Sequence, residues 1–79
     1  METVAAKIRE ILIENFGCDE SEVGDDQTLT GNLGMDSIEI VQLGLDIEEI
    51  FNVEVPDEAV AANMTVGEVI AAVYKLTQV

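Results

Sequence analysis

One serine stands where an outside enzyme could act on it. Ser37 follows Asp36 and opens a run of periodically spaced apolar residues, which is typical of the start of a helix. The chain contains no histidine, and a serine nucleophile of the Ser/His/Asp type needs that base for activation. A hydrolase of this type is therefore excluded. We interpret Ser37 as a hydroxyl that another enzyme modifies.

The surroundings of this serine are strongly acidic. Between Glu10 and Tyr74 there are 16 Asp and Glu residues and no Lys or Arg, and the net charge of the chain is −14. Nucleic acid is excluded as a partner, because its phosphate backbone is bound by Lys and Arg. Basic protein surfaces or divalent cations fit this charge better. We expect a monomer whose binding to partners weakens as salt is added.

Size and composition indicate one domain over residues 1–79. Hydrophobic residues make up 48% of the chain, which is too many for a disordered acidic tail. Cys18 is the single cysteine, so an intramolecular disulfide is excluded, and with no cationic neighbour it is expected to be an ordinary loop residue. There is no signal-peptide pattern and no apolar run of about 18 residues, so we expect a cytoplasmic protein without a membrane span.

The spacing of apolar residues predicts an all-α fold, a small four-helix bundle of three main helices and one short helix. The first helix should cover residues 2–16, with Gly17 as its stop signal. A long connection, residues 17–36, then leads to the second helix. Connections of this length are often functional. Three apolar residues should tie it to the core: Val23, Leu29 and Leu33.

The other helices have their own boundary signals. The second should run from Ser37 to about Asn52. A short third helix should follow Pro56, with Asp57 as its cap before residues 58–62. The last begins with the capping box at residues 65–68, which has the required threonine and glutamate three positions apart. Its apolar stripe consists of Val66, Val69, Ile70, Val73 and Leu76.

The second helix is predicted to have two apolar sides. At about 100° per residue, its core side is formed by Ile40, Leu43, Ile47, Ile50 and Phe51. The opposite side carries Ile38, Val41 and Leu45, interleaved with Gln42, Asp46, Glu48 and Glu49, while Glu39 lies at the edge. A small apolar centre with a charged rim favours a docking patch for a partner protein. The alternative is that these aliphatic side chains pack under the long connection.

Two interpretations of Ser37 are compatible with each other. Asp36 and Glu39 have the spacing of a capping box, which would give this segment a purely structural role. A phosphate ester on Ser37 would also lie at the positive end of the helix, which favours an anion by roughly 0.3–1 kcal/mol before repulsion from Asp36. Gly31 and Gly34 in the preceding loop should leave the hydroxyl accessible.

Residues 33–39, which read LGMDSIE, resemble the attachment motif of the acyl carrier proteins. The likeness continues through Val41-x-Leu43, Glu48-Glu49-x-Phe51, Val55-Pro56-Asp57-Glu58 and Thr65-Val66, and so covers essentially the whole chain. The resemblance implies that a separate phosphopantetheinyl transferase attaches 4′-phosphopantetheine from coenzyme A to Ser37. The thiol of this arm would then hold an acyl group as a thioester.

The resemblance also implies that the chain is not an enzyme. It would deliver acyl groups to acyl-transferring, condensing and modifying enzymes with basic docking surfaces, in fatty-acid or related lipid or polyketide biosynthesis. The cofactor supplies the chemistry and the protein supplies positioning. The recognition face implied by the motif contains Asp36, Ile38, Glu39, Val41, Leu45, Glu48 and Glu49, with Gln42 and Asp46 beside them.

Four positions depart from the pattern of housekeeping fatty-acid carriers. Gln42 stands where a glutamate used in docking is usual, Ile50 replaces a common acidic residue, and Gly44 replaces a larger apolar residue. Residues 59–62 are apolar where charge is usual. These differences favour, as an alternative, a specialised carrier for an aminoacyl or other dedicated pathway.

Two other classes of protein were considered. A calcium-binding module is suggested by the acidic run 19–26, but Val23 stands at the fifth ligand position and Thr30 at the twelfth, so the EF-hand pattern fails and no metal site is predicted. An unmodified acidic adaptor that binds a basic partner through the second helix remains the other alternative.

Overall fold

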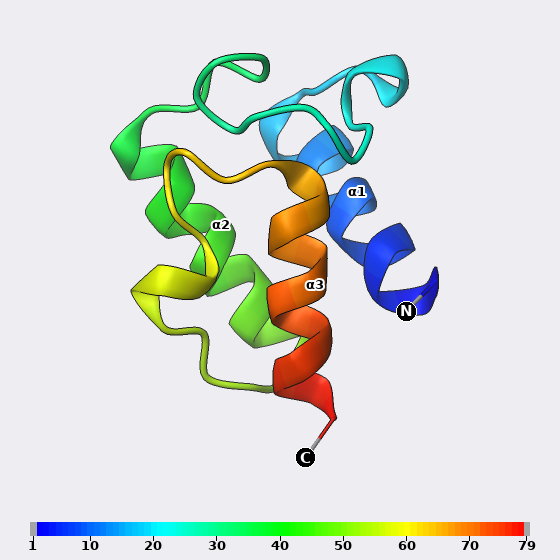
Figure 1. Ribbon diagram of the computed structural model, residues 1–79, viewed down its shortest axis with the longest axis vertical. Coiled ribbons are helices and arrows are strands. Elements are labelled where there is room, and N and C mark those ends of the chain that lie inside the picture. Colours follow the sequence, from blue (N-terminus) through cyan, green and yellow to red (C-terminus); the bar gives the residue numbers. More distant parts are fainter. Residues whose placement is uncertain (1, 79) are drawn as a thin grey trace.

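The computed structural model describes residues 2–78, which contain three α-helices and two single turns of 3-10 helix joined by loops (Figure 1). In order, they are α1 (Glu2–Phe16), η1 (Glu20–Glu22), α2 (Ser37–Phe51), η2 (Asp57–Ala59) and α3 (Val66–Thr77). The all-α prediction is confirmed. Within residues 2–78, extended pairing is limited to an isolated bridge between Thr28 and Thr65.

The predicted helix boundaries rest on backbone geometry that the structure confirms. Gly17 ends α1 with φ at +70°, a left-handed conformation that glycine adopts without a steric penalty. Asp36 caps α2, and Asn52 ends it in the left-handed region, with φ 55° and ψ 48°. Thr65 caps α3, and its hydroxyl accepts a hydrogen bond from the Glu68 N–H.

The prediction for the short third helix was wrong in its length and in its cap. The structure has only the turn η2, and Pro56, not Asp57, occupies its N-cap position. Val60 leaves helical geometry with φ −134° and ψ 87°, and its side chain is buried. Because this extended residue directs its side chain into the core, the chain cannot continue as a helix to Ala62.

The core is formed by the three α-helices together with both connections. α1 packs against α2 and against α3, and η2 packs against α3. Within α1, Val4, Ile8, Ile11 and Leu12 are buried, and Phe16 is half-buried. The fully buried side chains with the largest volumes are Ile8, Leu12, Leu29, Leu43, Ile47, Val66, Val69 and Val73.

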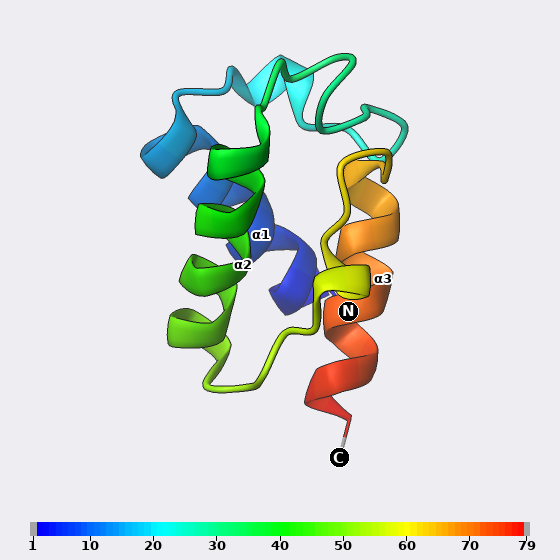
Figure 2. The same ribbon diagram turned by 90° about the vertical axis from the view of Figure 1, so that its left-hand side faces the viewer.

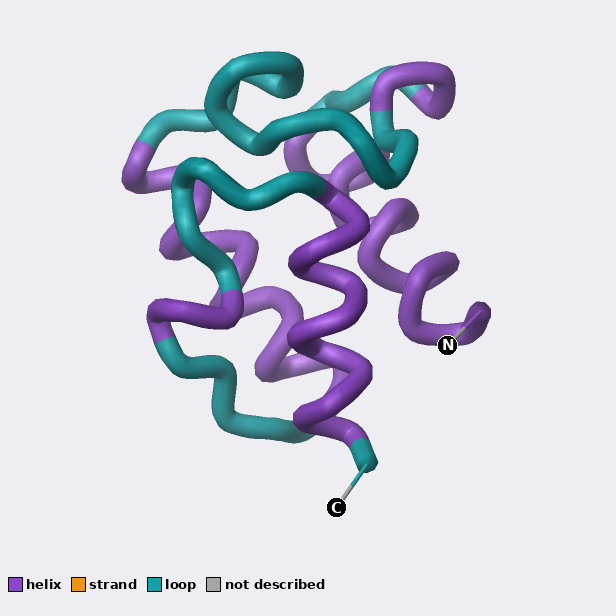
Figure 3. The backbone as a smooth tube through the Cα atoms, viewed as in Figure 1, coloured by secondary structure: helices purple, strands orange, loops and turns teal. Residues whose placement is uncertain are grey.

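The long connection, residues 17–36, crosses one end of the bundle (Figures 2 and 3). Its Leu29 N–H donates to the Met64 carbonyl at 3.0 Å, and the Gln27 carbonyl accepts from the Val66 N–H at 2.8 Å. As predicted, Val23 and Leu29 are buried and Leu33 packs partly buried against the core, and Met35 is buried as well. This connection is therefore part of the folded core.

The helices are oriented so that two of them begin at the same end of the molecule. α2 and α3 both start under the long connection, whereas the start of α1 and the end of α3 lie away from it (Figures 1 and 2). None of the described helices has the length and apolar character needed to cross a membrane.

Candidate functional site

Ser37 is the first residue of α2 and is exposed to solvent. The predicted capping box is present around it. The Asp36 carboxylate accepts from the Glu39 N–H at 2.8 Å, and the Glu39 carboxylate accepts from the Asp36 N–H at 3.2 Å. These two hydrogen bonds fix the first turn of the helix, and so they hold the Ser37 hydroxyl in a defined position at its end.

The first turn of α2 also has the electrostatics of an anion site. The capping box satisfies the N–H groups of Asp36 and Glu39, but those of Ser37 and Ile38 have no partner within a helix. They point out of the helix N-terminus, where the helix dipole is positive. A phosphate group bonded to the Ser37 oxygen fits this position, although the neighbouring Asp36 carboxylate opposes part of the gain.

A groove with a volume of about 410 Å³ begins at Ser37 and follows α2. We call it the Ser37 groove. Its α2 wall is formed by Ser37, Ile40, Val41, Gly44, Leu45 and Glu48, and its opposite wall by Val55, Pro56, Asp57, Val60 and Ala62. The walls are mainly aliphatic, as in most sites that take a small apolar group.

One carboxylate ties the two walls of the Ser37 groove together. Glu48 is half-buried, and its Oε2 accepts a hydrogen bond from the Val55 N–H at 2.8 Å. Glu48 therefore holds the segment after α2 in place. From the sequence, Glu48 was expected only to take part in partner recognition, because its hydrogen-bond partner comes from outside the helix.

The exposed side of α2 carries the predicted apolar residues. Ile38, Val41 and Leu45 are 78%, 63% and 52% exposed, so the alternative that they pack under the long connection is wrong. Gln42 and Glu49 beside them are also exposed. We call this set of five residues the docking face. Its apolar centre is small, and none of its members is covered by the described chain.

Three other residues of the predicted partner face have contacts of their own. Asp46 accepts from Asn15 of α1 at 3.1 Å and from Gln42 at 2.8 Å, so it is turned toward α1. Glu39 and Asp36 are joined in the capping box. These carboxylates still contribute negative potential, but their side chains are less available to a partner than that of Glu49.

One residue assigned to the core side of α2 is not buried. Ile50 is 48% exposed, whereas Ile40, Leu43 and Ile47 are buried and Phe51 packs half-buried against the core. At about 100° per residue, Ile50 lies at the edge of the core stripe, next to the side that carries Asp46. The prediction that Ile50 belongs to the core side was wrong, because it relied on the apolar character of the side chain alone.

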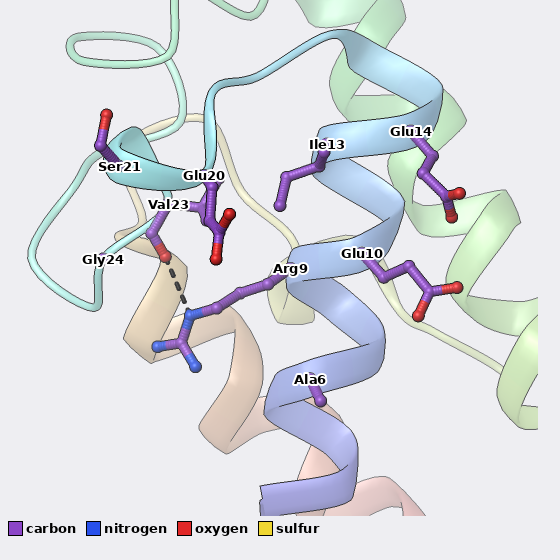
Figure 4. A pocket seen from close by; sticks show the side chains of 9 residues that line it. All are labelled: Ala6, Arg9, Glu10, Ile13, Glu14, Glu20, Ser21, Val23 and Gly24. Atoms are coloured by element: carbon purple, nitrogen blue, oxygen red, sulfur yellow. Dashed lines mark hydrogen bonds between the residues drawn. The ribbon is translucent and has the colours of Figure 1, made fainter.

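A larger hollow, of about 660 Å³, lies between α1 and the segment around η1 (Figure 4). Its Arg9 donates from Nε to the Val23 carbonyl at 3.0 Å and forms an ion pair with Asp25. Its one hydroxyl, that of Ser21, donates to the Asp19 carboxylate at 2.9 Å. The contacts of Arg9 fasten the long connection to α1, and the Ser21 hydroxyl is engaged within that connection, so the larger hollow has a structural role and offers no reactive group.

Cys18 and the acidic side chains offer no second chemical site. Burial raises the pKa of the Cys18 thiol, and the nearby carboxylates of Glu22 and Glu39 raise it further. The thiol is therefore neutral at neutral pH and a weak nucleophile. Among the side chains of residues that the structure describes, no group of three or more His, Cys, Asp or Glu is arranged to hold a metal ion.

Comparisons with known proteins agree with this geometry. A family model described as a phosphopantetheine attachment site matches residues 6–73. The chain is 33% identical over 75 residues to an acyl carrier protein of Sinorhizobium fredii and, to the same degree, to the acyl carrier protein AcpP of Rhizobium meliloti; each match covers 95% of this chain and 96% of the relative.

The fold is also similar to that of an acyl carrier protein. A solved structure of acyl carrier protein from Enterococcus faecalis is similar with a TM-score of 0.77 and 27% identity, over 95% of both chains. The family match covers most of the chain, and its description names the covalent cofactor as phosphopantetheine. This chain belongs to the acyl carrier protein family.

Proposed function

We propose that the Ser37 hydroxyl carries the 4′-phosphopantetheine arm and that the chain transports acyl groups on it. The observation that supports this most strongly is the position of Ser37. It is an exposed hydroxyl on the first turn of a capped helix, at the mouth of an apolar groove. When bound, the arm supplies a thiol that holds acyl groups as thioesters. The chain supplies the position of the arm and shelter for its cargo.

Three parts of the chain contribute to holding the arm and its acyl group. The N–H groups of Ser37 and Ile38 favour the phosphate of the arm. The aliphatic walls of the Ser37 groove bury an apolar acyl group and keep water from it. Glu48 holds the far wall through its hydrogen bond to Val55. The chain is thus a cofactor-bearing substrate of other enzymes.

The docking face is proposed to bind those enzymes. Ile38, Val41 and Leu45 give an apolar centre, and Glu49 adds charge at its rim. The net charge of −14 attracts basic surfaces over a distance. The partners are the phosphopantetheinyl transferase and acyl-transferring, condensing and modifying enzymes with basic docking surfaces, and the protein works as a cytoplasmic monomer.

The pathway is proposed to be fatty-acid or related lipid or polyketide biosynthesis. A specialised carrier is the second candidate, and specific residues favour it. Gln42 places an uncharged side chain beside the apolar centre of the docking face, and Gly44 leaves one position of the α2 wall of the groove without a side chain. A dedicated partner set would explain both features.

Enzymatic loading tests the attachment site. Purified protein is incubated with coenzyme A, Mg²⁺ and a broad-specificity transferase, and the intact mass is measured. The Ser37 oxygen should form the new bond to phosphorus as the pyrophosphate bond of coenzyme A breaks, adenosine 3′,5′-bisphosphate leaves and the hydroxyl proton is released. We expect a mass gain of one phosphopantetheine.

Two serine variants serve as controls for this experiment. Ser37→Ala should gain nothing, whereas Ser21→Ala, which removes another exposed hydroxyl, should be loaded like the parent protein. Loading of Ser37→Ala, or no loading of the folded parent protein that starts without the arm, would overturn the proposal. An unmodified acidic adaptor would then be the better interpretation.

Charge reversal tests the docking face. Glu49→Lys should slow turnover by a partner enzyme, with the loss shrinking as salt is added, because it reverses an exposed charge beside Leu45. Glu48→Lys is a poorer test, because it also breaks the hydrogen bond to Val55. Equal turnover of Glu49→Lys and the parent protein at low salt would contradict the assignment.

A further inference from the structure

Neither the backbone conformation nor a close contact requires a glycine at position 44. Gly17 and Gly34 have positive φ angles. A Cβ at Gly31 would lie 2.6 Å from a threonine hydroxyl, and one at Gly67 would lie 3.0 Å from the backbone of the long connection. A Cβ at Gly44 would meet no heavy atom within 4 Å, and the residue lies inside α2. There a glycine costs about 1 kcal/mol relative to alanine.

The empty space beside Gly44 belongs to the Ser37 groove. Ser37, Val41, Gly44 and Glu48 are spaced by four, three and four residues, so they form one stripe along α2 that lines the groove. Gly44 is seven residues beyond Ser37, which is about 10 Å along the helix axis. A side chain at this position would therefore project into the groove between its mouth and the Glu48–Val55 hydrogen bond.

We propose that Gly44 is a specificity-determining residue that widens the Ser37 groove for an acyl group bulkier than a straight chain, such as a branched or ring-bearing one. The inference rests on the proposed function, since the occupant is the cargo of the arm at Ser37. At this depth the groove is bordered by aliphatic side chains, including Ile40 and Val60. Such walls disfavour a charged cargo and accept an apolar one.

The inference is tested with two cargoes on the same arm. Parent protein and variants are loaded from octanoyl-coenzyme A or 4-phenylbutanoyl-coenzyme A, and intact mass confirms loading. The melting temperature of each loaded form is then compared with that of the same protein bearing the arm without an acyl group. A cargo that enters the groove stabilises the fold, because it binds only the folded state.

We expect both cargoes to raise the melting temperature of the parent protein by several degrees. Gly44→Val should keep the rise with octanoyl and lose most of it with phenylbutanoyl. Gly44→Ala controls for helix propensity and should melt higher than the parent protein without cargo. Lys7→Val places the same side chain at an exposed position of α1, outside both the Ser37 groove and the docking face, and should respond to both cargoes as the parent protein does.

Failure of this inference can be told apart from failure of the proposed function. If Gly44→Val keeps the full phenylbutanoyl rise, or if neither cargo stabilises loaded parent protein, Gly44 does not select the cargo. In both cases the mass measurement would still establish Ser37 as the attachment site. A parent protein that gains no mass would overturn the proposed function and, with it, the inference about Gly44.

Discussion

The two connections of this carrier are held in different ways. The long connection, residues 17–36, is joined to α3 by backbone hydrogen bonds across the molecule and buries Val23, Leu29 and Met35. The second connection, residues 52–65, forms one wall of the Ser37 groove. Its first part, residues 52–61, is held mainly by short-range hydrogen bonds around the turn at Asp57–Ala59 and by the side chain of Glu48. Its last part is tied to the long connection, because the Ala62 carbonyl accepts from the Thr30 hydroxyl and the Met64 carbonyl accepts from the Leu29 N–H, both at 3.0 Å.

The difference shows that the length of a loop is a poor guide to its rigidity. The longer connection is part of the core, because its apolar side chains and its backbone both have distant partners. The first part of the shorter one, residues 52–61, depends on local contacts that open at little cost in free energy. We therefore expect the groove wall at residues 55–61 to be the part that moves when cargo enters.

Truncation of buried side chains should give the largest contrast between the connections. Leu29→Ala should lower the free energy of unfolding by about 2–5 kcal/mol, because it leaves a cavity under the long connection. Val23→Ala and Val60→Ala are a matched pair, one in each connection. We expect Val23→Ala to cost more, because Val60 borders the groove. Urea denaturation measures the free energy of unfolding of all three variants. Equal losses for Val23→Ala and Val60→Ala would contradict the difference between the two connections.

Hydrogen exchange should separate the connections without any substitution. After correction for intrinsic rates, the amides of Val66 and Gly67 should exchange on the order of tenfold more slowly than those of Val55 and Ala59. The first two donate to carbonyls of the long connection, whereas the others have partners close by in the sequence. Equal protection would show that the second connection is as firmly held as the first.

Adjacent glutamates on α2 allow a sharper test of the groove wall. Glu48→Ala should lower the free energy of unfolding by about 1 kcal/mol, because it leaves the Val55 N–H without its partner. Glu49→Ala removes the same charge from an exposed position and should stay within about 0.5 kcal/mol. Glu48→Gln keeps an acceptor oxygen and should recover part of the loss. A cost for Glu49→Ala equal to that for Glu48→Ala would point to charge alone.

Ionisation of the Cys18 thiol is expected to have the smallest effect on the stability of the protein. Its pKa is raised in the folded protein, chiefly by burial, so the unfolded chain loses its proton first as pH rises. Stability should consequently fall slightly as pH passes above the ordinary thiol pKa. Iodoacetamide should also alkylate Cys18 more slowly in the folded Ser37→Ala variant, which has no arm thiol, than in urea. Equal rates would show that the long connection does not shield it.

The features of α2 that are local in sequence could be predicted from it. The capping box at Asp36 and Glu39 and the exposed side at Ile38, Val41 and Leu45 all depend on spacing within one helix. These features define the candidate site. The family resemblance added the cofactor, which no property of the isolated residues determines.

Features that depend on contacts between distant residues could not be predicted. Glu48 meets Val55, and Asp46 meets Asn15, only after the chain has folded. The end of η2 depends on burial of Val60, and the exposure of Ile50 depends on its place at the edge of a stripe. Met35 is buried without belonging to a periodic apolar run, so spacing gave no signal for it.

The placement of the first and last helical turns has a practical consequence. The start of α1 and the end of α3 lie away from the end of the bundle where α2 begins (Figures 1 and 2). A fluorescent label, an affinity tag or a linker to a solid support joined at either of these turns would therefore leave the Ser37 hydroxyl uncovered. The protein could be anchored to a sensor surface in this way, and its loading and partner exchange followed in real time on one immobilised sample.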